Sequence, residues 1–495
     1  MTPSKKKADL FHTDDDDDEG DNSYIYTRLT GAALDIAFHT SLNAFGSLDR
    51  TDYASFQPCF EKSQDRVVVE DIEIGGQVWR LRCIFDGHAG NAAVDYIQQA
   101  IVPTLRARLA VLDASAPPTD ATISTALSSS LLAIDDAIGN EARALFPPDL
   151  DSLTDAQIRA IADDHKDGGS GANHEKLLRA KSGSTALVAL VDPAGERLWV
   201  ASLGDCTAAL CTRQEKGGPW TVERLSANHN GIEPDEAARV RAEHPGEEGA
   251  MLNDRVRYLF SLPRILTDPP TPALGDYFCK YPPDFVRRVL VASDPNLKFS
   301  ATKVDDFLAR LLTPPYVSAQ PEVRCVRIGT GSATANDAHS TPPPAEQLLV
   351  MFSDGLPECV LDDFSTAEPY LQVLPRILDR ALRSTAEASF NAEAILNAEG
   401  PSLSAAGASV NGKPTLPRPD AKRNLAAAII RETLAGGEEW LPVMQAMKYG
   451  EVVPKLGKER RLDHAERDDR LSQLLTVEMT GKWMDDVTAV VHRIV

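Results

Sequence analysis

Three apolar segments lie close together near the middle of the chain, and they constrain the fold more than any other feature. Only short turns rich in glycine, proline and aspartate separate them, and the segments cover residues 184–191, 197–203 and 208–212. Short apolar runs bounded by such turns predict strands. Expected helices, such as those at 121–146 and 424–434, do not alternate regularly with the strands. The sequence therefore favours a mixed α+β fold over a doubly wound parallel sheet.

A further expected strand leads directly into a polar turn. Trp79, Leu81, Cys83 and Phe85 alternate with other residues, which predicts a strand with one buried face. The strand stops at the sequence Asp-Gly-His-Ala-Gly of residues 86–90. A helix is expected next, because its apolar residues fall on one stripe at Val94, Ile97, Ile101 and Leu105.

Aspartates recur where expected strands end or begin. Asp86 and Asp354 each end an apolar strand and precede a glycine, Asp205 follows the strand 197–203, and Asp485 and Asp486 open the last strand at 487–495. Strands that pack together bring their ends to one rim, so distant aspartates can converge there. A glycine beside an aspartate lets the backbone approach an ion and offer a carbonyl oxygen. Converging oxygen ligands suit Mg²⁺ or Mn²⁺ rather than zinc.

Composition and missing motifs exclude several other functions. The chain of 495 residues carries 51 Lys and Arg against 73 Asp and Glu, a formal net charge of −22, which argues against binding nucleic acid or an anionic membrane. It has no GxxxxGK[ST] phosphate loop and no GxSxG elbow. His165 and His174 match no zinc spacing. Its seven cysteines form no CxxC pair, which favours a reducing compartment over a disulfide framework.

Five short motifs occur in an order that resembles the metal-dependent serine/threonine protein phosphatases of type 2C. They are FDGHAG at 85–90, GSTA at 183–186, LGD at 203–205, SDG at 353–355 and DDVT at 485–488. Other segments resemble the pyruvate dehydrogenase phosphatase branch of that family: LSANHN at 225–230, TPPYVSAQPEV at 313–323 and NLAAAIIRETLAGG at 424–437. The resemblance spans about residues 60–495.

The resemblance implies a four-layer αββα sandwich, with two antiparallel sheets flanked by helices, and an activity that uses metal-activated water to hydrolyse phosphoserine or phosphothreonine. It implies two Mg²⁺ or Mn²⁺ ions, with a third as a further option. His88 would be the general acid that protonates the leaving oxygen. Asp86 would bridge two metals, with the Gly87 carbonyl on one of them. The other expected metal residues are Asp354 and Asp485 at the second metal, Asp205 and Glu358 at a weaker third site, and Asp65 in the acidic pair that follows the family's first strand.

The sequence also departs from the family pattern. Gln64 stands where the family has a glutamate that orders a metal through water, and Pro272 replaces the arginine of the motif R-A-x-G-D. Both departures favour an alternative reading, a weakened or inactive relative that binds phosphoproteins and regulates a partner. A different metal hydrolase such as a nuclease is a third reading, and the acidic composition argues against it.

Domain organisation and location follow from the same reasoning. Residues 1–23, with the run Asp14–Asp18, are expected to form a disordered acidic tail. Residues 24–495 are expected to form the phosphatase domain, with loop insertions near 263–283, 329–345 and 397–420. The N-terminus resembles neither a secretory signal nor a transit peptide, which favours cytoplasm or nucleus, with the mitochondrial matrix as the alternative. A phosphoprotein substrate is the expected partner, no membrane span is expected, and the oligomeric state is left open.

Overall fold

A computed structural model describes most of the chain, and it divides into two compact units. Unit 1 comprises residues 1–63, 209–223 and 344–495, and unit 2 comprises 64–208 and 224–343. The described residues are 4–9, 23–59, 62–112, 118–164, 171–229, 234–247, 251–252, 255–256, 273–292, 301–329, 344–360, 368–398, 423–436, 462–478 and 484–495.

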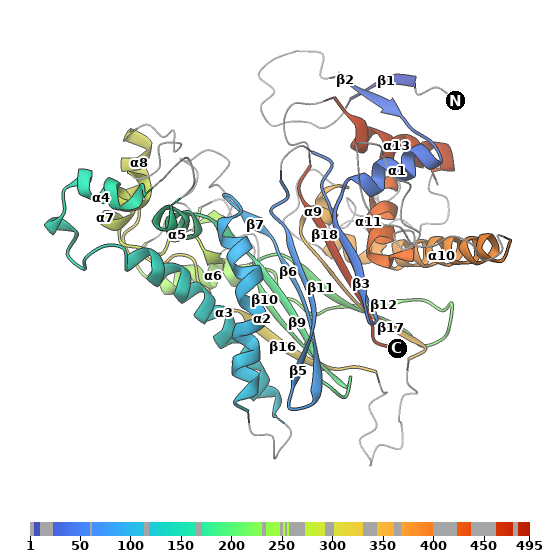
Figure 1. The fold of residues 1–495 in the computed structure, drawn as a ribbon, viewed down its shortest axis with the longest axis horizontal. Helices are drawn as coiled ribbons and strands as arrows, with labels where there is room; N and C mark the ends of the chain where they lie inside the picture. The colour runs from blue at the N-terminus through green and yellow to red at the C-terminus, as the bar shows by residue number, and fades with distance from the viewer. Residues whose placement is uncertain are drawn as a thin grey trace. The chain divides into compact units, whose positions relative to one another are not determined.

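Unit 1 is built on a six-stranded sheet with the order β12-β11-β17-β18-β4-β3 (Figure 1). Its pairs β3–β4, β4–β18 and β18–β17 are antiparallel. The strands are β3 (Leu42–Leu48), β4 (Thr51–Phe56), β11 (Thr207–Arg213), β12 (Thr221–Arg224), β17 (Glu346–Phe352) and β18 (Val487–Arg493). The helices are α1 (Ala32–Thr40), α9 (Gly355–Glu358), α10 (Glu368–Ala398), α11 (Leu425–Ala435) and α13 (His464–Thr476).

The core of unit 1 lies between this sheet and its helices. Helix α11 packs on β4 and β18, and its residues are almost all buried. The Phe352 ring of β17 meets Tyr370 of α10 edge to face, with 5.0 Å between ring centroids. A two-stranded sheet pairs β1 (Ser4–Asp9) with β2 (Ser23–Arg28). The remaining residues of the expected N-terminal tail lie outside the described part of the chain, so that tail remains a prediction.

Unit 2 is built on a five-stranded antiparallel sheet with the order β16-β10-β9-β6-β5. Its strands are β5 (Arg66–Ile74), β6 (Gln77–Phe85), β9 (Ala186–Val191), β10 (Arg197–Leu203) and β16 (Glu322–Arg327). A small sheet joins β7 (Gly87–His88), β8 (Gly183–Ser184) and β15 (Leu274–Gly275). A further short pair is β13 (Met251–Leu252) with β14 (Arg255–Val256).

Helices cover the sheet of unit 2. Helix α2 packs on β5 and on α3, and it buries the expected stripe of Val94, Ile97, Ile101 and Leu105. The helical segments are α2 (Ala92–Ala110), α3 (Asp120–Arg143), α4 (Asp155–Ala162), α5 (Ala172–Lys181), α6 (Pro234–Glu243), α7 (Pro283–Phe285), a π-helical turn (Val286–Val291) and α8 (Ala301–Leu308), with a 3₁₀ turn at Leu150–Ser152.

The expected α+β class, with antiparallel sheets flanked by helices, is confirmed. One expected strand differs from the structure, because the segment 184–191 is divided at Thr185. Residues 186–191 form β9, whereas Gly183 and Ser184 form β8 and pair with β7 and β15. The physical reason is that Thr185 bonds to Asp86 through both backbone and side chain. The Asp86 N–H donates to Thr185 Oγ1 at 3.1 Å, and the Thr185 N–H donates to the Asp86 carbonyl at 2.8 Å.

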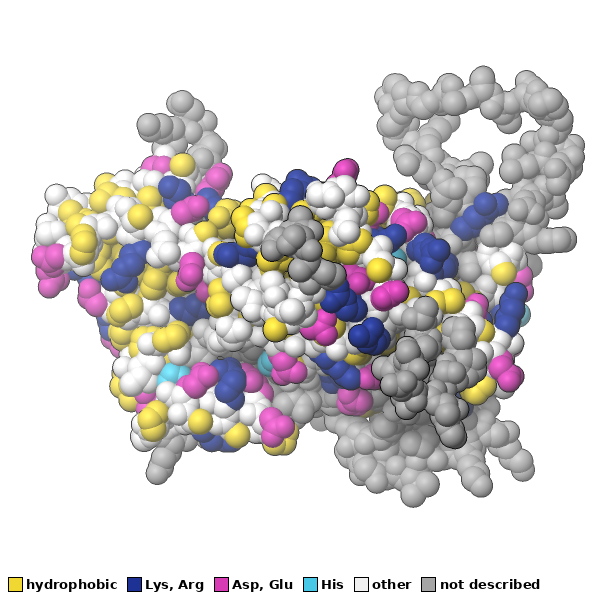
Figure 2. Space-filling model, turned by 90° about the horizontal axis from the view of Figure 1, so that it is seen from below, with side chains coloured by type: hydrophobic (Ala, Val, Ile, Leu, Met, Phe, Trp, Pro, Cys, Tyr) yellow, Lys and Arg dark blue, Asp and Glu magenta, His cyan; other side chains and the backbone are white. Residues whose placement is uncertain are grey.

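Charged side chains of both signs are interspersed on the face shown in Figure 2. The excess of acidic residues is therefore not gathered into a single acidic patch on the described surface of that face. Among the described residues, no helix combines the length and the apolar character that crossing a membrane would require. Pro272 and most of the expected insertions at 263–283, 329–345 and 397–420 lie outside the described residues, and the domain boundaries remain predictions.

Candidate functional site

Three carboxylates converge in unit 1 where β17 ends and β18 begins. Asp354, Glu358 and Asp485 each offer an oxygen atom, and these atoms all lie within 4.8 Å of one another. Asp354 and Glu358 are half-buried and Asp485 is exposed. We call these three residues the carboxylate cluster. The structure therefore brings together three of the residues that the sequence predicted as metal ligands, including Glu358, which had been expected at a separate, weaker site.

The adjacent strands β17 and β18 place these side chains. The Ser353 N–H donates to the Thr488 carbonyl at 3.0 Å, and the Thr488 N–H donates to Ser353 Oγ at 2.9 Å. These bonds tie the end of one strand to the start of the next. Gly355 is required at the crossing point, because a Cβ there would lie 2.1 Å from the Asp486 carbonyl oxygen. The chain can therefore turn directly from β17 into the helix that carries Glu358.

The neighbouring Asp486 has a different, structural role. Its side chain is buried, and Oδ1 accepts a hydrogen bond from Gln57 Nε2 at 3.0 Å. Its backbone N–H donates to Asp485 Oδ1 at 2.7 Å. Of the two consecutive aspartates before β18, Asp485 is thus the one that joins the carboxylate cluster.

Unit 2 gathers a second group of predicted residues around the Asp86–Gly90 loop. Asp86 follows β6, and the pairing of β7 with β8 sets Gly87 opposite Ser184 and His88 opposite Gly183. The Gly90 N–H donates to Gln64 Oε1 at 3.2 Å, so Gln64 lies against this loop. The residue that departs from the family pattern therefore contacts the loop that carries Asp86 and His88.

His88 forms a close pair with Asp276. Its Nε2 lies 2.9 Å from Oδ1 and 2.8 Å from Oδ2 of that carboxylate. The His88 side chain is 25% exposed and the Asp276 side chain 7% exposed. Burial of the imidazole acts to lower the pKa of His88. The charge and hydrogen bond of Asp276, with the charge of Asp205, act in the opposite direction and raise the pKa above its ordinary value.

Hydrogen bonds of the backbone fix the chain at Asp205 and at Asp65 in unit 2. The Gly204 N–H donates to His229 Nδ1 at 3.3 Å, and the His229 N–H returns a bond to the Gly204 carbonyl at 3.1 Å. Burial lowers the pKa of His229, which keeps the ring neutral and able to accept. Asp65 is buried just before β5, and its carbonyl accepts from Arg66 Nη1 at 2.8 Å.

The pairing of Asp276 with His88 was not predicted. The sequence offered one signal, because Leu274-Gly275-Asp276 repeats the context of a strand end followed by glycine and aspartate. A strand of two residues has no periodicity, so its partner could not be inferred. The predicted residues thus fall into two groups, with Asp65, Asp86, Gly87, His88 and Asp205 in unit 2 and the carboxylate cluster in unit 1.

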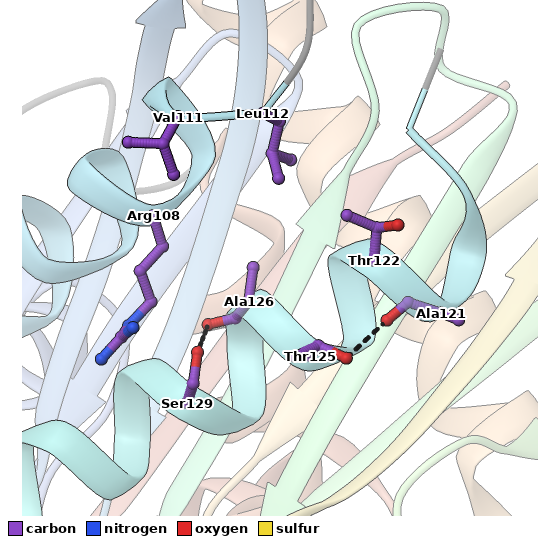
Figure 3. A pocket seen from close by; sticks show the side chains of 8 residues that line it. All are labelled: Arg108, Val111, Leu112, Ala121, Thr122, Thr125, Ala126 and Ser129. Carbon is purple, nitrogen blue, oxygen red and sulfur yellow. Dashed lines mark hydrogen bonds between the residues drawn. The ribbon is translucent and has the colours of Figure 1, made fainter. Parts of the chain in front are cut away.

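A pocket of about 460 Å³ lies elsewhere in unit 2, between α2 and α3 (Figure 3). None of the predicted site residues lines it. The hydroxyl groups of Thr125 and Ser129 donate to the carbonyls of Ala121 and Ala126 in their own helix. These two hydroxyl protons are therefore engaged within α3.

The sequence model of the family described as Protein phosphatase 2C matches residues 52–363, more than half of the chain. The chain belongs to the protein phosphatase 2C family. The matched range contains the Asp86–Gly90 loop, Asp205, Asp354 and Glu358, and the resemblance inferred from the five motifs is confirmed.

Two curated relatives are similar to the chain over different lengths. A protein phosphatase 2C homolog of Schizosaccharomyces pombe is 29% identical over 344 residues, covering 68% of this chain and 64% of the relative. Human mitochondrial pyruvate dehydrogenase phosphatase 1 is 33% identical over 191 residues, covering 38% of this chain and 31% of the relative. The chain thus spans less than two thirds of the length of either relative.

A solved structure, the serine-threonine phosphatase 2C of Toxoplasma gondii, is similar to 91% of this chain and to 96% of its own length. The sequence identity is 14% and the TM-score is 0.42.

The residues of the carboxylate cluster fit a hard divalent cation. The donor set consists of oxygen atoms only, and Mg²⁺ and Mn²⁺ prefer carboxylate and water oxygens. Three negative charges within 4.8 Å repel one another, and a dication offsets that repulsion. The family's dependence on Mg²⁺ or Mn²⁺ is therefore compatible with the residues that this chain provides.

We expect Asp354→Asn to raise the Tm of the metal-free protein slightly and to abolish most of the Tm increase caused by Mn²⁺. Removing one of three like charges relieves repulsion, whereas binding of an ion to the native state stabilises it. A change of about 1 kcal/mol shifts Tm by about 2–4 °C in a protein of 150–250 residues, and a shift of that order or smaller is expected here. Thermal unfolding with and without Mn²⁺ measures both effects.

Asp379→Asn is the matched control, because Asp379 is an aspartate of unit 1 that pairs instead with Trp220 Nε1 at 3.1 Å and with Arg213. This variant should keep the full response to Mn²⁺. If Mn²⁺ raises the Tm of Asp354→Asn as much as that of the wild type, the carboxylate cluster does not bind the ion.

Proposed function

We propose that the protein is a Mg²⁺- or Mn²⁺-dependent phosphatase that hydrolyses phosphoserine and phosphothreonine in proteins. The observation that carries the proposal is the presence, within a phosphatase 2C chain, of both an all-oxygen carboxylate cluster and a histidine-aspartate pair beside a strand-end aspartate. The first can hold cations, and the second can deliver a proton. Removal of a phosphoryl group from an alkoxide requires both functions.

The proposal gives each group a separate task. Asp354, Glu358 and Asp485 would hold a cation in unit 1, and Asp86, the Gly87 carbonyl, Asp65 and Asp205 are the proposed ligands in unit 2. When bound, a divalent cation lowers the pKa of a water molecule and offsets the charge of the phosphoryl oxygens. His88 holds a proton, because Asp276 favours the charged imidazole, and it donates this proton to the seryl or threonyl oxygen as the ester bond breaks.

The first candidate substrate is a phosphorylated mitochondrial dehydrogenase. This proposal is supported by the similarity to human mitochondrial pyruvate dehydrogenase phosphatase 1 over 191 residues. This substrate would place the protein in the mitochondrial matrix, and the alternative location is the cytoplasm or nucleus. Imaging of the tagged full-length protein distinguishes these compartments.

A second candidate function is a weakened relative that binds phosphoproteins without turning them over efficiently. Gln64 supports this alternative, because an uncharged amide lies against the Asp86–Gly90 loop where the family pattern has a glutamate. The loss of one negative charge near a dication weakens the binding of that dication.

We expect hydrolysis of a phosphothreonine peptide to require added Mn²⁺ or Mg²⁺ and to stop when a chelator is added. Asp86→Asn should lower kcat by more than about a hundredfold, because changes even in the outer shell of a metal site cost about ten- to a hundredfold. Phosphate release measures both effects. Asp151→Asn, whose exposed side chain contacts Arg288, controls for the loss of one negative charge. Activity that survives exhaustive chelation would exclude the proposed mechanism.

Gln64→Glu separates a weakened enzyme from an inactive one. Glutamate keeps the oxygen that accepts from Gly90 and adds a negative charge, so we expect a lower Mn²⁺ concentration at half-maximal activity with little change in the saturated kcat. An effect of about 1.4 kcal/mol corresponds to a tenfold change in this concentration. A metal titration of activity measures it. If the wild type is inactive at every metal concentration and Gln64→Glu restores nothing, the non-catalytic alternative is favoured.

A further inference from the structure

We infer that Asp276 is a positioning residue that holds His88 in the orientation from which its imidazole donates a proton to the leaving oxygen. The inference rests on the proposed phosphatase function and adds a residue to it. It starts from the two contacts of Asp276 with His88 Nε2, at 2.8 and 2.9 Å. Within the described part of the chain, Nε2 is the ring nitrogen of His88 that is hydrogen bonded. Nδ1 is therefore the nitrogen that remains for the substrate.

Asp276 occupies a backbone position that is fixed from several sides. Its φ angle is 54°, in the left-handed region that aspartate adopts more readily than most residues. Its N–H donates to the Ser182 carbonyl at 3.1 Å. The preceding Gly275 N–H donates to Asp135 Oδ1 of α3 at 2.8 Å. The carboxylate of Asp276 is thus presented to His88 by a turn that cannot easily move.

A buried ion pair supports the same turn. Lys280 Nζ donates to Asp135 Oδ1 and to the Ala273 carbonyl, both at 2.8 Å. The side chains of Lys280 and Asp135 are 7% and 8% exposed. Asp135 pairs with the Lys280 ammonium group and neutralises its charge. The carboxylate of Asp276 is therefore paired with His88 rather than with Lys280. The geometry resembles the general arrangement in which a third group orients a catalytic imidazole and selects its tautomer.

Gly183 allows the two side chains to meet. A Cβ at residue 183 would lie 2.3 Å from His88 Nε2 and 2.3 Å from Asp276 Oδ2. Any other residue would therefore displace the pair. Gly183 is also the strand partner of both His88 in β7 and Gly275 in β15. The small sheet therefore brings His88 and Asp276 together across the space that Gly183 leaves open.

The test compares two substrates that differ in their need for an acid. The leaving group of a phosphothreonine peptide is a threonyl alkoxide, which needs a proton. The leaving group of p-nitrophenyl phosphate is a stable phenolate, which does not. Asp276→Asn should lower kcat for the peptide by roughly ten- to a hundredfold, with KM unchanged, and should leave kcat for p-nitrophenyl phosphate nearly unchanged. The double variant His88→Gln/Asp276→Asn should be no slower than His88→Gln alone, because Asp276 acts through His88.

Asp192→Asn is the matched control, since Asp192 is a buried aspartate of unit 2 that accepts from the N–H and Nε of Arg197. It should lower stability without changing the ratio of kcat values for the two substrates. Asp276→Ser provides a second variant, with the same expected selective loss, and circular dichroism confirms folding of each. Equal losses on both substrates, or a double variant whose loss is the product of the single losses, would overturn the inference.

The parallel His88→Gln measurement separates this inference from the proposed function. A selective loss on the peptide for His88→Gln, without one for Asp276→Asn, overturns the positioning role alone. Equal losses on both substrates for His88→Gln remove the general acid, and the inference falls with it. Absence of hydrolysis in the wild type at saturating Mn²⁺ contradicts the proposed function and the inference together.

Discussion

Mutual repulsion among Asp354, Glu358 and Asp485 is the constraint on which the proposed chemistry depends. Two unit charges at about 4 Å repel by about 4 kcal/mol at an effective dielectric constant of about 20 and by about 1 kcal/mol in water, so the exposed Asp485 contributes less repulsion than the half-buried Asp354 and Glu358. The fold nevertheless holds their oxygen atoms within 4.8 Å. Pairing of β17 with β18 and the close approach of Gly355 to Asp486 enforce this arrangement. A bound dication would offset this repulsion, and its binding would stabilise the folded protein.

In unit 2, strand ends also bring residues together that are distant in the sequence, but the groups that meet are different. The ends of β6, β8 and β15 bring Asp86, Gly183 and Asp276 to one place, and the small three-stranded sheet joins them. The result there is not a cluster of like charges but a carboxylate that faces an imidazole. Unit 1 thus offers carboxylate oxygens to a cation, whereas unit 2 offers both the proposed ligands around Asp86 and a histidine that can hold a proton.

The sequence predicted those parts of the site that lie at the ends of long, periodic strands. β17 contains the apolar run 348–352 and β18 is apolar over 487–491 except for Thr488, so Asp354 and Asp485 could be placed at strand ends, and the alternation of Trp79, Leu81, Cys83 and Phe85 did the same for Asp86. The contact of His88 with Asp276 spans 188 positions and depends on strands of two residues, which carry no periodic signal. Nor could the sequence show that Glu358 lies with Asp354 and Asp485, because that depends on the turn at Gly355.

Direct measurement of bound Mn²⁺ tests the central claim, which is that the carboxylate cluster is a cation site. Equilibrium dialysis of the wild type against Mn²⁺ should be compared with the double variant Asp354→Asn/Asp485→Asn, and with Asp151→Asn/Asp155→Asn as the control of equal charge. We predict that the control binds as many ions as the wild type, and that the cluster variant binds at least one fewer while keeping its fold. Equal numbers of bound ions with equal affinity in all three proteins would contradict the account.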